Sequence, residues 1–271
     1  MKTRIISAAV LLPILLIVVL VLPEIVAAVL LAIMSAMAAY ELLYATGLVR
    51  HVRLLVYSMV SAAAVPIWCH FGMSHAWGTL GIVLFVSLVY GEMMLSHVKA
   101  RFEKTAYCFV AGLLIPYLFS SLIRILDGGN GRFMIMVPLI LAFLPDSGAY
   151  FAGSYFGKHK LAPVISPKKT VEGAIGGSLT AILGMLVYAV ILDLAFSFEV
   201  HYGAVLLYGL LGSLGDVFGD LMFSSIKRQT GIKDYGNLIP GHGGILDRFD
   251  SMMLVAPLAE ALLLLLPVAV K

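Results

Sequence analysis

The amino-acid sequence predicts an all-α polytopic membrane protein. Hydrophobic residues make up 61% of its 271 residues and charged residues only 12%, and the mean hydropathy is +1.03. These values lie far outside the range of soluble globular proteins. At about 20 residues for each membrane-spanning helix, this length accommodates roughly eight to ten helices with short connections. We therefore expect one integral membrane domain over residues 1–271.

Nine apolar segments follow one another along the chain, each long enough to predict a transmembrane helix. They cover residues 5–22, 25–46, 54–69, 79–95, 108–126, 133–152, 173–196, 204–224 and 251–270. The first segment follows Lys2 and Arg4 as in a signal peptide, but no small-residue cleavage site and polar mature start follow it, so we interpret it as a retained helix. Helices 1 to 5 fall in residues 1–126, and helices 6 to 9 fall in residues 127–271 together with two polar loops, 146–173 and 216–250.

Basic residues are distributed unevenly over the connections. If the connections alternate between the two sides of the membrane, one side receives 15 of the 18 basic residues, and the other receives only Arg124, Arg132 and Lys271. The positive-inside rule then predicts a cytoplasmic amino terminus, cytoplasmic basic loops and an external carboxyl terminus.

Five acidic residues lie near the predicted cytoplasmic ends of helices 2, 4, 6 and 8: Glu41, Glu92, Asp146, Asp216 and Asp220. Ionisable groups in membrane helices are costly and usually face a cavity or a partner. We therefore expect a polar active-site cavity that opens to the cytoplasm. The alternative is that single residues such as Glu41 and Glu92 only reach to the membrane interface.

Asp216 and Asp220 are spaced to lie on one face of a helix, with Gly215 and Gly219 beside them. Small residues there allow a metal ion or another backbone to come close, although they also serve plain helix packing. This pattern favours a metal site.

The first polar loop leads into helix 7. Pro145 and Gly148 are expected to break or kink helix 6, and Thr170 is expected to cap helix 7. Lys168 and Lys169 would then face an anion at the amino end of that helix. For the two lysines the alternative is contact with anionic lipid head groups.

The second polar loop combines four fixed cations and three carboxylates in the 27 residues from Ser224 to Asp250, between two apolar helices. Glycines allow backbone N–H groups to approach phosphate oxygens, cations neutralise them, and carboxylates hold Mg²⁺. The expected substrate is therefore phosphorylated and lies at a membrane. The sequence has no Walker motif, no dinucleotide glycine fingerprint and no zinc-binding histidine pair.

This loop resembles the signature of the phosphatidate cytidylyltransferase (CDP-diacylglycerol synthase) family. The matching elements are Ser-x-apolar-Lys-Arg, Lys-Asp-x-small, Pro-x-His-Gly-Gly and apolar-x-Asp-Arg-x-Asp. Residues 146–173 resemble the second polar block of the family, whereas the amino-terminal half resembles it only as a series of membrane helices. The resemblance implies a nucleotidyltransferase of phospholipid biosynthesis that converts CTP and phosphatidate to CDP-diacylglycerol and pyrophosphate.

The same resemblance implies the surroundings of the enzyme. Mg²⁺ is the expected cofactor, with a second metal or a monovalent cation as an open possibility. The expected partners are CTP, phosphatidate and the lipid bilayer, with a homodimer as a further candidate and no nucleic acid. The expected location is a bacterial-type inner (plasma) membrane, crossed several times, with the active site facing the cytoplasm.

Site residues follow from the chemistry of in-line attack by a lipid phosphate on the α-phosphorus of CTP, which is stabilised mainly by metal and cationic charge. The catalytic candidates are Asp220, Lys227, Arg228, His242, Asp247, Arg248 and Asp250. The substrate-binding candidates are Lys168, Lys169, Lys233, Ser224, Gly243 and Gly244. The metal-ligand candidates are Asp220, Asp247 and Asp250, with Asp216 and Asp146 further out. For His242, proton donation and a plain orienting hydrogen bond remain alternatives.

Two other functions compete with this one. A cytidylyltransferase for another lipid phosphate would use the same residues. A transporter of an anionic solute also contains interrupted helices and intramembrane acids, but it places its site at the membrane midplane, within paired repeats that this sequence lacks.

The charge asymmetry yields a test of topology. A reporter tag in the loop around Lys160 should be cytoplasmic, and a tag after Lys271 should be external. Labelling from each side of sealed vesicles measures this. Cytoplasmic labelling at both positions would contradict the predicted number of helices.

Overall fold

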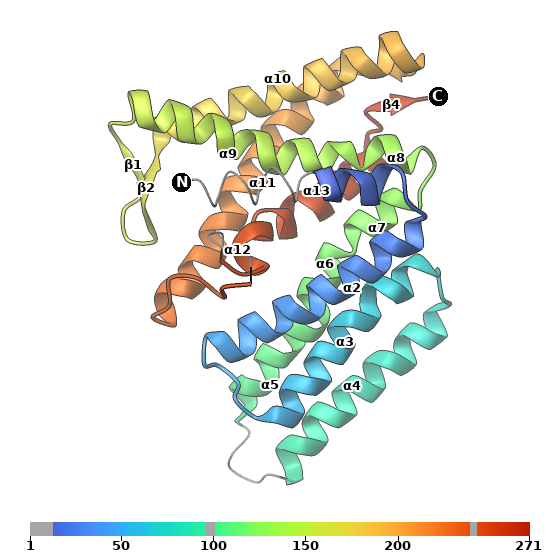
Figure 1. Cartoon of the computed structure of the whole chain (residues 1–271), viewed down its shortest axis with the longest axis vertical. Coiled ribbons are helices and arrows are strands. Elements are labelled where there is room, and N and C mark those ends of the chain that lie inside the picture. Colours follow the sequence, from blue (N-terminus) through green and yellow to red (C-terminus); the bar gives the residue numbers. More distant parts are fainter. Residues whose placement is uncertain (1–12, 96–100, 239–242) are drawn as a thin grey trace. The chain divides into compact units, whose positions relative to one another are not determined.

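The computed structural model of the chain describes residues 13–95, 101–238 and 243–271, which are mostly helical (Figure 1). The chain forms two compact units. The first unit contains the described residues up to Arg132 together with Lys227–Phe249, and the second contains Phe133–Ile226 and Asp250–Lys271. The chain passes from the second unit to the first after Ile226 and returns to the second after Phe249. Both of these boundaries lie within the Ser224–Asp250 signature.

The first unit is built from amino-terminal helices that lie side by side. Figure 1 shows α2, α3 and α4 in this arrangement, in blue to cyan. Its elements are α2 (Glu24–Tyr40), η1 (Glu41–Ala45), α3 (Val52–His70), α4 (His75–Leu95), α5 (Phe102–Phe109), η2 (Val110–Leu114), α6 (Ile115–Phe119), α7 (Ser121–Leu126), α8 (Gly131–Met134, which continues into the second unit) and α12 (Leu246–Phe249).

Small side chains let the helices of this unit approach closely. The buried positions of α2 include Ala28, Ala32, Ser35 and Ala39, which recur at helical spacing, and α2 packs mainly against α3. Apolar lipid gives helices little reason to associate, so close van der Waals contact between small residues is what holds such interfaces together. Two helices in this unit also contain one π-helical turn each, η1 and η2.

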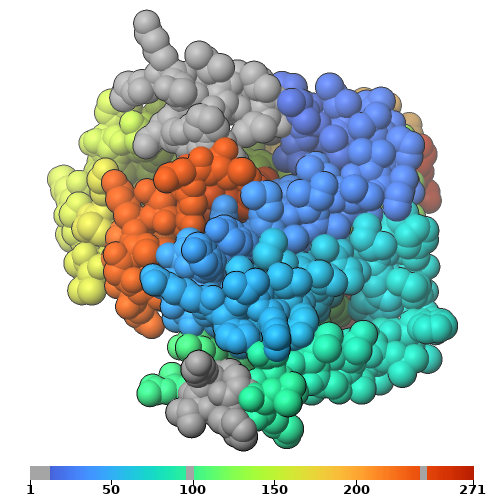
Figure 2. Space-filling view, turned by 60° about the horizontal axis from the view of Figure 1, so that its bottom comes forward, coloured from blue at the N-terminus to red at the C-terminus, as the bar shows by residue number. Residues whose placement is uncertain are grey.

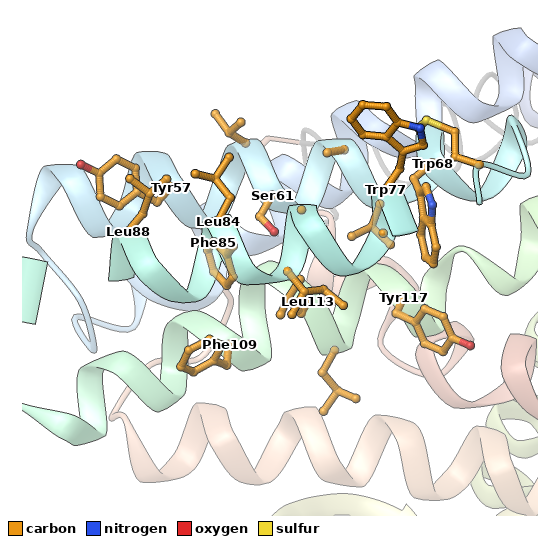
Figure 3. Close-up of a pocket in the computed structure, with 18 of the residues that line it drawn as sticks. Tyr57, Ser61, Trp68, Trp77, Leu84, Phe85, Leu88, Phe109, Leu113 and Tyr117 are labelled. Atoms are coloured by element: carbon orange, nitrogen blue, oxygen red, sulfur yellow. The ribbon is translucent and has the colours of Figure 1, made fainter. Parts of the chain in front are cut away.

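An apolar hollow of about 830 Å³ lies among α3, α4 and the helices after Phe102. Figure 3 shows aromatic rings from three of these elements around it, among them Trp68, Trp77 and Phe109. None of its described lining residues is acidic or basic. It therefore cannot bind phosphate by charge, and it is no candidate for the polar site.

The second unit contains the longest helices. Its elements are α9 (Met136–Phe156), β1 (Lys160–Ala162), β2 (Ser166–Thr170), α10 (Val171–Phe196), β3 (Glu199–Val200), α11 (Tyr202–Gln229, whose last three residues belong to the first unit), α13 (Met252–Leu265) and β4 (Ala269–Val270). The antiparallel pair β1–β2 links α9 to α10, and β3 pairs antiparallel with β4. Figure 1 shows α9 and α10 lying along each other.

Glycines account for the close contact of α9 with α10. A Cβ atom at Gly176 would lie 2.2 Å from the Cβ of Ala152, and one at Gly177 would lie 2.9 Å from the carbonyl oxygen of Pro145. A break or kink was predicted at Pro145 and Gly148, and the break is wrong, since α9 continues through both residues. A proline removes one helical hydrogen bond, but packing against a neighbouring helix holds both sides in place.

Seven described helical segments are long and apolar enough to cross a membrane, and each falls on a segment predicted from the sequence. They are Glu24–Ala45, Val52–His70, His75–Leu95, Phe102–Leu126, Gly131–Phe156, Val171–Phe196 and Tyr202–Gln229. Of the first predicted segment, residues 13–20 are helical and residues 5–12 lie outside the described residues. The last predicted segment contains a helix of 14 residues, Met252–Leu265. That helix is about 21 Å long, shorter than a hydrocarbon core of about 30 Å.

The α9–α10 contact yields a stability prediction. Gly176→Ala places a methyl group against Ala152, which has no flexible end that could move away, so we expect a loss of about 1–3 kcal/mol. The thermal unfolding midpoint in detergent measures it. Gly91→Ala is the matched control, because a Cβ atom there meets nothing within 4 Å. Equal midpoints for the two variants would contradict close glycine packing.

Candidate active site

The polar residues singled out in the sequence form two clusters, one in each unit. The loop cluster, in the first unit, comprises Glu41, Lys227, Tyr235, Gly244 and Asp247. The aspartate cluster, in the second unit, comprises Asp146, Lys169, Asp216, Asp220 and Ser251.

Asp247 is the centre of the loop cluster. Its Oδ1 accepts a hydrogen bond from Lys227 Nζ at 2.9 Å. Its Oδ2 accepts from the backbone N–H of Tyr235 at 2.7 Å and from that of Gly244 at 3.0 Å. The Asp247 side chain therefore ties together three parts of the signature: the end of α11, the segment after it and the start of α12.

Lys227 and Asp247 form a buried ion pair, with each residue 8% exposed. The Lys227 ammonium also lies 5.4 Å from the centre of the Tyr235 ring, which adds a cation–π contact. Such a pair is stable only if hydrogen bonds compensate for the lost hydration of both charges. The two backbone N–H groups bonded to Asp247 provide this compensation.

The two glycines of the signature are required by close approaches. Gly243 has a φ of +86°, and a Cβ atom on it would lie 2.8 Å from Asp247 Oδ2. A Cβ atom on Gly244 would lie 2.4 Å from Glu41 Oε1. Both glycines were predicted to bind substrate, and in the structure they allow two carboxylates to contact the loop backbone.

The other cations of the signature lie at the surface. Arg228, Lys233 and Arg248 are exposed, which is the position needed for contact with a polyanion. His242, a catalytic candidate, lies outside the described residues.

The aspartate cluster is assembled by α9, α11 and the segment before α10. Lys169, from β2, forms an ion pair with Asp220 on α11. Asp220 also accepts a hydrogen bond of 3.1 Å from Ser224 Oγ, one turn further along α11. Ser224, predicted to bind substrate, therefore orients a candidate metal ligand.

Asp216 is the most deeply buried acid of this cluster, at 2% exposure. It lies within electrostatic range of Asp146, Lys169 and Asp220, and it accepts a hydrogen bond from Ser251. Its Oδ1 is buried without a hydrogen-bond partner among the described residues. An orphaned carboxylate oxygen near two other carboxylates is an arrangement that a bound cation would stabilise.

Gly219, between the two aspartates, admits another backbone, which is one of the alternatives that the sequence left open. A Cβ atom on it would lie 2.8 Å from the Cα of Ser251 and 3.1 Å from the carbonyl oxygen of Asp250. The small residue therefore lets the backbone of 250–251 lie against α11. This contact brings Asp250, a metal-ligand candidate, to the helix that carries Asp216 and Asp220.

A cavity of about 330 Å³ with charged residues in its lining opens at this cluster. Its lining contains charges of both signs: the acids Asp146 and Asp216 and the bases Lys168 and Lys169. Opposite charges beside one hollow fit a ligand that is itself an anion accompanied by a cation.

The amino end of α10 borders this cavity. The expected cap is confirmed, because Thr170 Oγ1 accepts a hydrogen bond of 3.1 Å from the Gly173 N–H. The Val171 N–H donates to the carbonyl oxygen of His159. Two of the first N–H groups of α10 are therefore already bonded, and the helix end offers an anion fewer donors than the sequence suggested.

No group of three or more His, Cys, Asp or Glu side chains in the described ranges is arranged to hold a metal ion as it stands. The aspartate cluster nevertheless supplies the hard oxygen ligands that Mg²⁺ prefers, together with the orphaned oxygen of Asp216. The residues present thus fit a divalent cation in chemistry.

Two acids have partners that the sequence did not reveal. Glu41 accepts hydrogen bonds from the backbone of the signature, more than 200 positions away. Glu92 instead contacts His51 at 3.4 Å and Arg53 at 3.3 Å, which joins α4 to the start of α3. Both acids lie near the predicted cytoplasmic end of an apolar segment, which indicated that each could be buried. The sequence did not indicate that their partners differ.

The membrane-length helices are those of a polytopic membrane protein, and each unit contains a charged cluster suited to phosphate chemistry. Comparison with known proteins agrees: the chain belongs to the cytidylyltransferase family, whose family model matches residues 2–266.

Similar curated proteins come from staphylococci, and all of the following are named phosphatidate cytidylyltransferase. The protein of Staphylococcus aureus (strain COL) is 40% identical over 179 residues, covering 65% of this chain and 66% of that protein. Those of Staphylococcus epidermidis and Staphylococcus saprophyticus are 38% identical over 188 and 184 residues, covering 68% and 66% of this chain and 68% and 66% of those proteins. The matched region thus spans about two thirds of each relative.

The buried ion pair yields a further prediction. Asp247→Leu leaves the Lys227 ammonium buried without its partner, so we expect a loss of about 3–5 kcal/mol. The double variant Asp247→Leu, Lys227→Met removes both charges and should recover part of that loss. Thermal unfolding in detergent measures both. A double variant less stable than the single variant would contradict a role of Asp247 as the partner of Lys227.

Proposed function

We propose that this chain transfers the cytidylyl group of CTP to phosphatidate, which forms CDP-diacylglycerol and releases pyrophosphate. The observation that carries the proposal is the aspartate cluster, whose Asp146 and Asp216 line one cavity with Lys168 and Lys169, within a chain of the cytidylyltransferase family. The reaction joins two polyanions, so it needs cations for the phosphates and carboxylates for a metal.

The chemical step is an in-line displacement. A phosphate oxygen of phosphatidate forms a bond to the α-phosphorus of CTP, while the bond from that phosphorus to the oxygen bridging to the β-phosphate breaks. Pyrophosphate leaves with that bonding electron pair. Little covalent chemistry falls to the protein in such a reaction, so positioning and charge stabilisation account for most of the catalysis.

Cationic side chains bind and orient the two substrates in this proposal. Lys168 and Lys169 line the cavity of the aspartate cluster, and Arg228, Lys233 and Arg248 are exposed on or after the end of α11. Arginine can bind two phosphate oxygens at once, whereas lysine acts as a point charge. Lys227 has a different role here, since its ion pair with Asp247 orders the signature.

Mg²⁺ would be held by Asp216 and Asp220, with Asp146 and Asp250 beside them. When bound, it neutralises charge on the triphosphate and the leaving pyrophosphate. Ser251 and Ser224 orient Asp216 and Asp220 through hydrogen bonds. Lys169 balances the charge of Asp220 through their ion pair.

The setting of the enzyme follows from the helices and the charges. We place the chain in a bacterial plasma membrane with its amino terminus and active site on the cytoplasmic side, where CTP is available. Nine membrane segments, an external carboxyl terminus and assembly as a homodimer belong to the same proposal. The apolar helices and the bacterial relatives support the membrane location.

Activity tests the proposal directly. Purified protein in mixed micelles should convert labelled CTP and phosphatidate to CDP-diacylglycerol, dependent on Mg²⁺, with other lipid phosphates used less well. Asp220→Asn keeps the side-chain volume but weakens cation binding, so we expect turnover to fall by about 100-fold or more.

The matched control for this variant is Asp193→Asn. Asp193 lies near the carboxyl end of α10, whereas the aspartate cluster lies near the amino end of that helix. Among the described contacts, its carboxylate accepts only a hydrogen bond of 3.0 Å from Tyr202. It should keep near-normal turnover. Solute uptake into liposomes without any cytidylyl transfer would replace the proposal with the transporter alternative. Near-normal rates for Asp220→Asn throughout a Mg²⁺ titration would exclude Asp220 from the metal site.

A further inference from the structure

The carboxylate of Glu41 contacts the signature at its backbone. Oε1 accepts a hydrogen bond of 2.9 Å from the Ile245 N–H, and Oε2 accepts one of 2.9 Å from the Leu246 N–H. These two N–H groups lie just before and at the first residue of α12, where backbone N–H groups have no partner within the helix. Both oxygens of one carboxylate thus satisfy two adjacent N–H groups, and hydrogen bonds to a charged acceptor are the stronger kind.

The surroundings of Glu41 are shaped to this contact. Glu41 is 4% exposed, so it does not reach to a membrane interface. Cβ atoms on Gly236 and Gly244 would lie 2.8 Å and 2.4 Å from its Oε1. Two signature glycines therefore make room for one carboxylate that comes from the amino-terminal helices.

The backbone at Glu41 has an unusual form. Glu41 is the first residue of the π-helical turn η1, which directly continues α2. Single π-helical turns inside α-helices redirect side chains and occur often at functional sites.

The signature segment is fixed to the first unit at further points. The Phe249 ring, at the end of α12, lies 5.6 Å from the Phe119 ring of α6. In Figure 2 the orange surface of the segment after Lys227 adjoins the blue surface of the amino-terminal helices. Together, Glu41 and Asp247 bind the backbone N–H groups of four signature residues: Tyr235, Gly244, Ile245 and Leu246.

We propose that Glu41 is a positioning residue for catalysis, which holds the start of α12 in the shape that aims the neighbouring Arg248 at substrate phosphate. Arg248 follows Asp247 in this short helix and is exposed, so its position depends on how α12 is held. This inference rests on the proposed function and assigns a task to the amino-terminal half, which the family resemblance left without one.

Glu41→Gln is the informative change. The glutamine oxygen still accepts one hydrogen bond, but its NH₂ group faces the second backbone N–H, and two donors repel each other. We expect kcat to fall by about 10-fold or more, as for other residues that orient catalytic groups. Amide hydrogen exchange in the peptide covering 243–249 should become faster, with the thermal midpoint close to that of the wild type.

Glu92→Gln is the matched control, because Glu92 is a similarly buried acid of the first unit that contacts side chains of α3 instead of the signature. It should leave exchange in 243–249 and kcat close to the wild type. A second comparison uses Gly244→Ala, alone and with Glu41→Ala. If Gly244 serves to admit Glu41, the glycine replacement should cost much less activity once Glu41 is absent.

Two results would overturn the inference. The first is unchanged exchange in 243–249 for Glu41→Gln, which would mean that the carboxylate does not hold this segment. The second is faster exchange with wild-type kcat, which would mean that the order of α12 does not matter for turnover. A wild-type protein without cytidylyl transfer would contradict the proposed function instead, and the exchange measurement would then decide alone whether Glu41 fixes the loop.

Discussion

A charge buried among apolar helices must be compensated where it lies, because lost hydration costs several kcal/mol for each ion. This constraint explains the partners of the polar residues in both units. Asp247 is met by Lys227 and two backbone N–H groups, and Glu41 by two more. Gly236, Gly243 and Gly244 leave room for these two carboxylates beside the backbone. The signature is therefore a loop whose shape is set by two buried carboxylates.

The aspartate cluster shows the same constraint only partly met. Asp220 has Lys169 and Ser224, whereas Asp216 has a hydrogen bond from Ser251 and one oxygen with no described hydrogen-bond partner. Carboxylates placed near one another repel, and such an arrangement persists in proteins where a cation completes it. The two clusters thus differ in how far their buried charges are compensated. The loop cluster orders the backbone of the signature, and the aspartate cluster offers oxygen atoms of the kind that a divalent cation would need.

Much of the fold was predictable from the sequence. Each of the seven described membrane-length helices coincides with a predicted segment, because hydropathy over some 20 residues is a local property. The cap at Thr170 was predictable for the same reason, because the residues that form it are three positions apart. The continuity of α9 through Pro145 was not, because a proline in an apolar segment indicates a break as readily as a continuous helix.

The sequence by itself determined the membrane class, the family and the residue types of the site, since these follow from local composition and from a motif of fixed spacing. Only the tertiary structure decided which charge meets which. In the folded chain Asp247 forms an ion pair with Lys227, and Asp220 forms one with Lys169. Glu41 accepts hydrogen bonds from the backbone of Ile245 and Leu246. Electrostatic compensation acts through space between residues that spacing cannot relate, so partners in a buried polar network emerge only when the chain is folded.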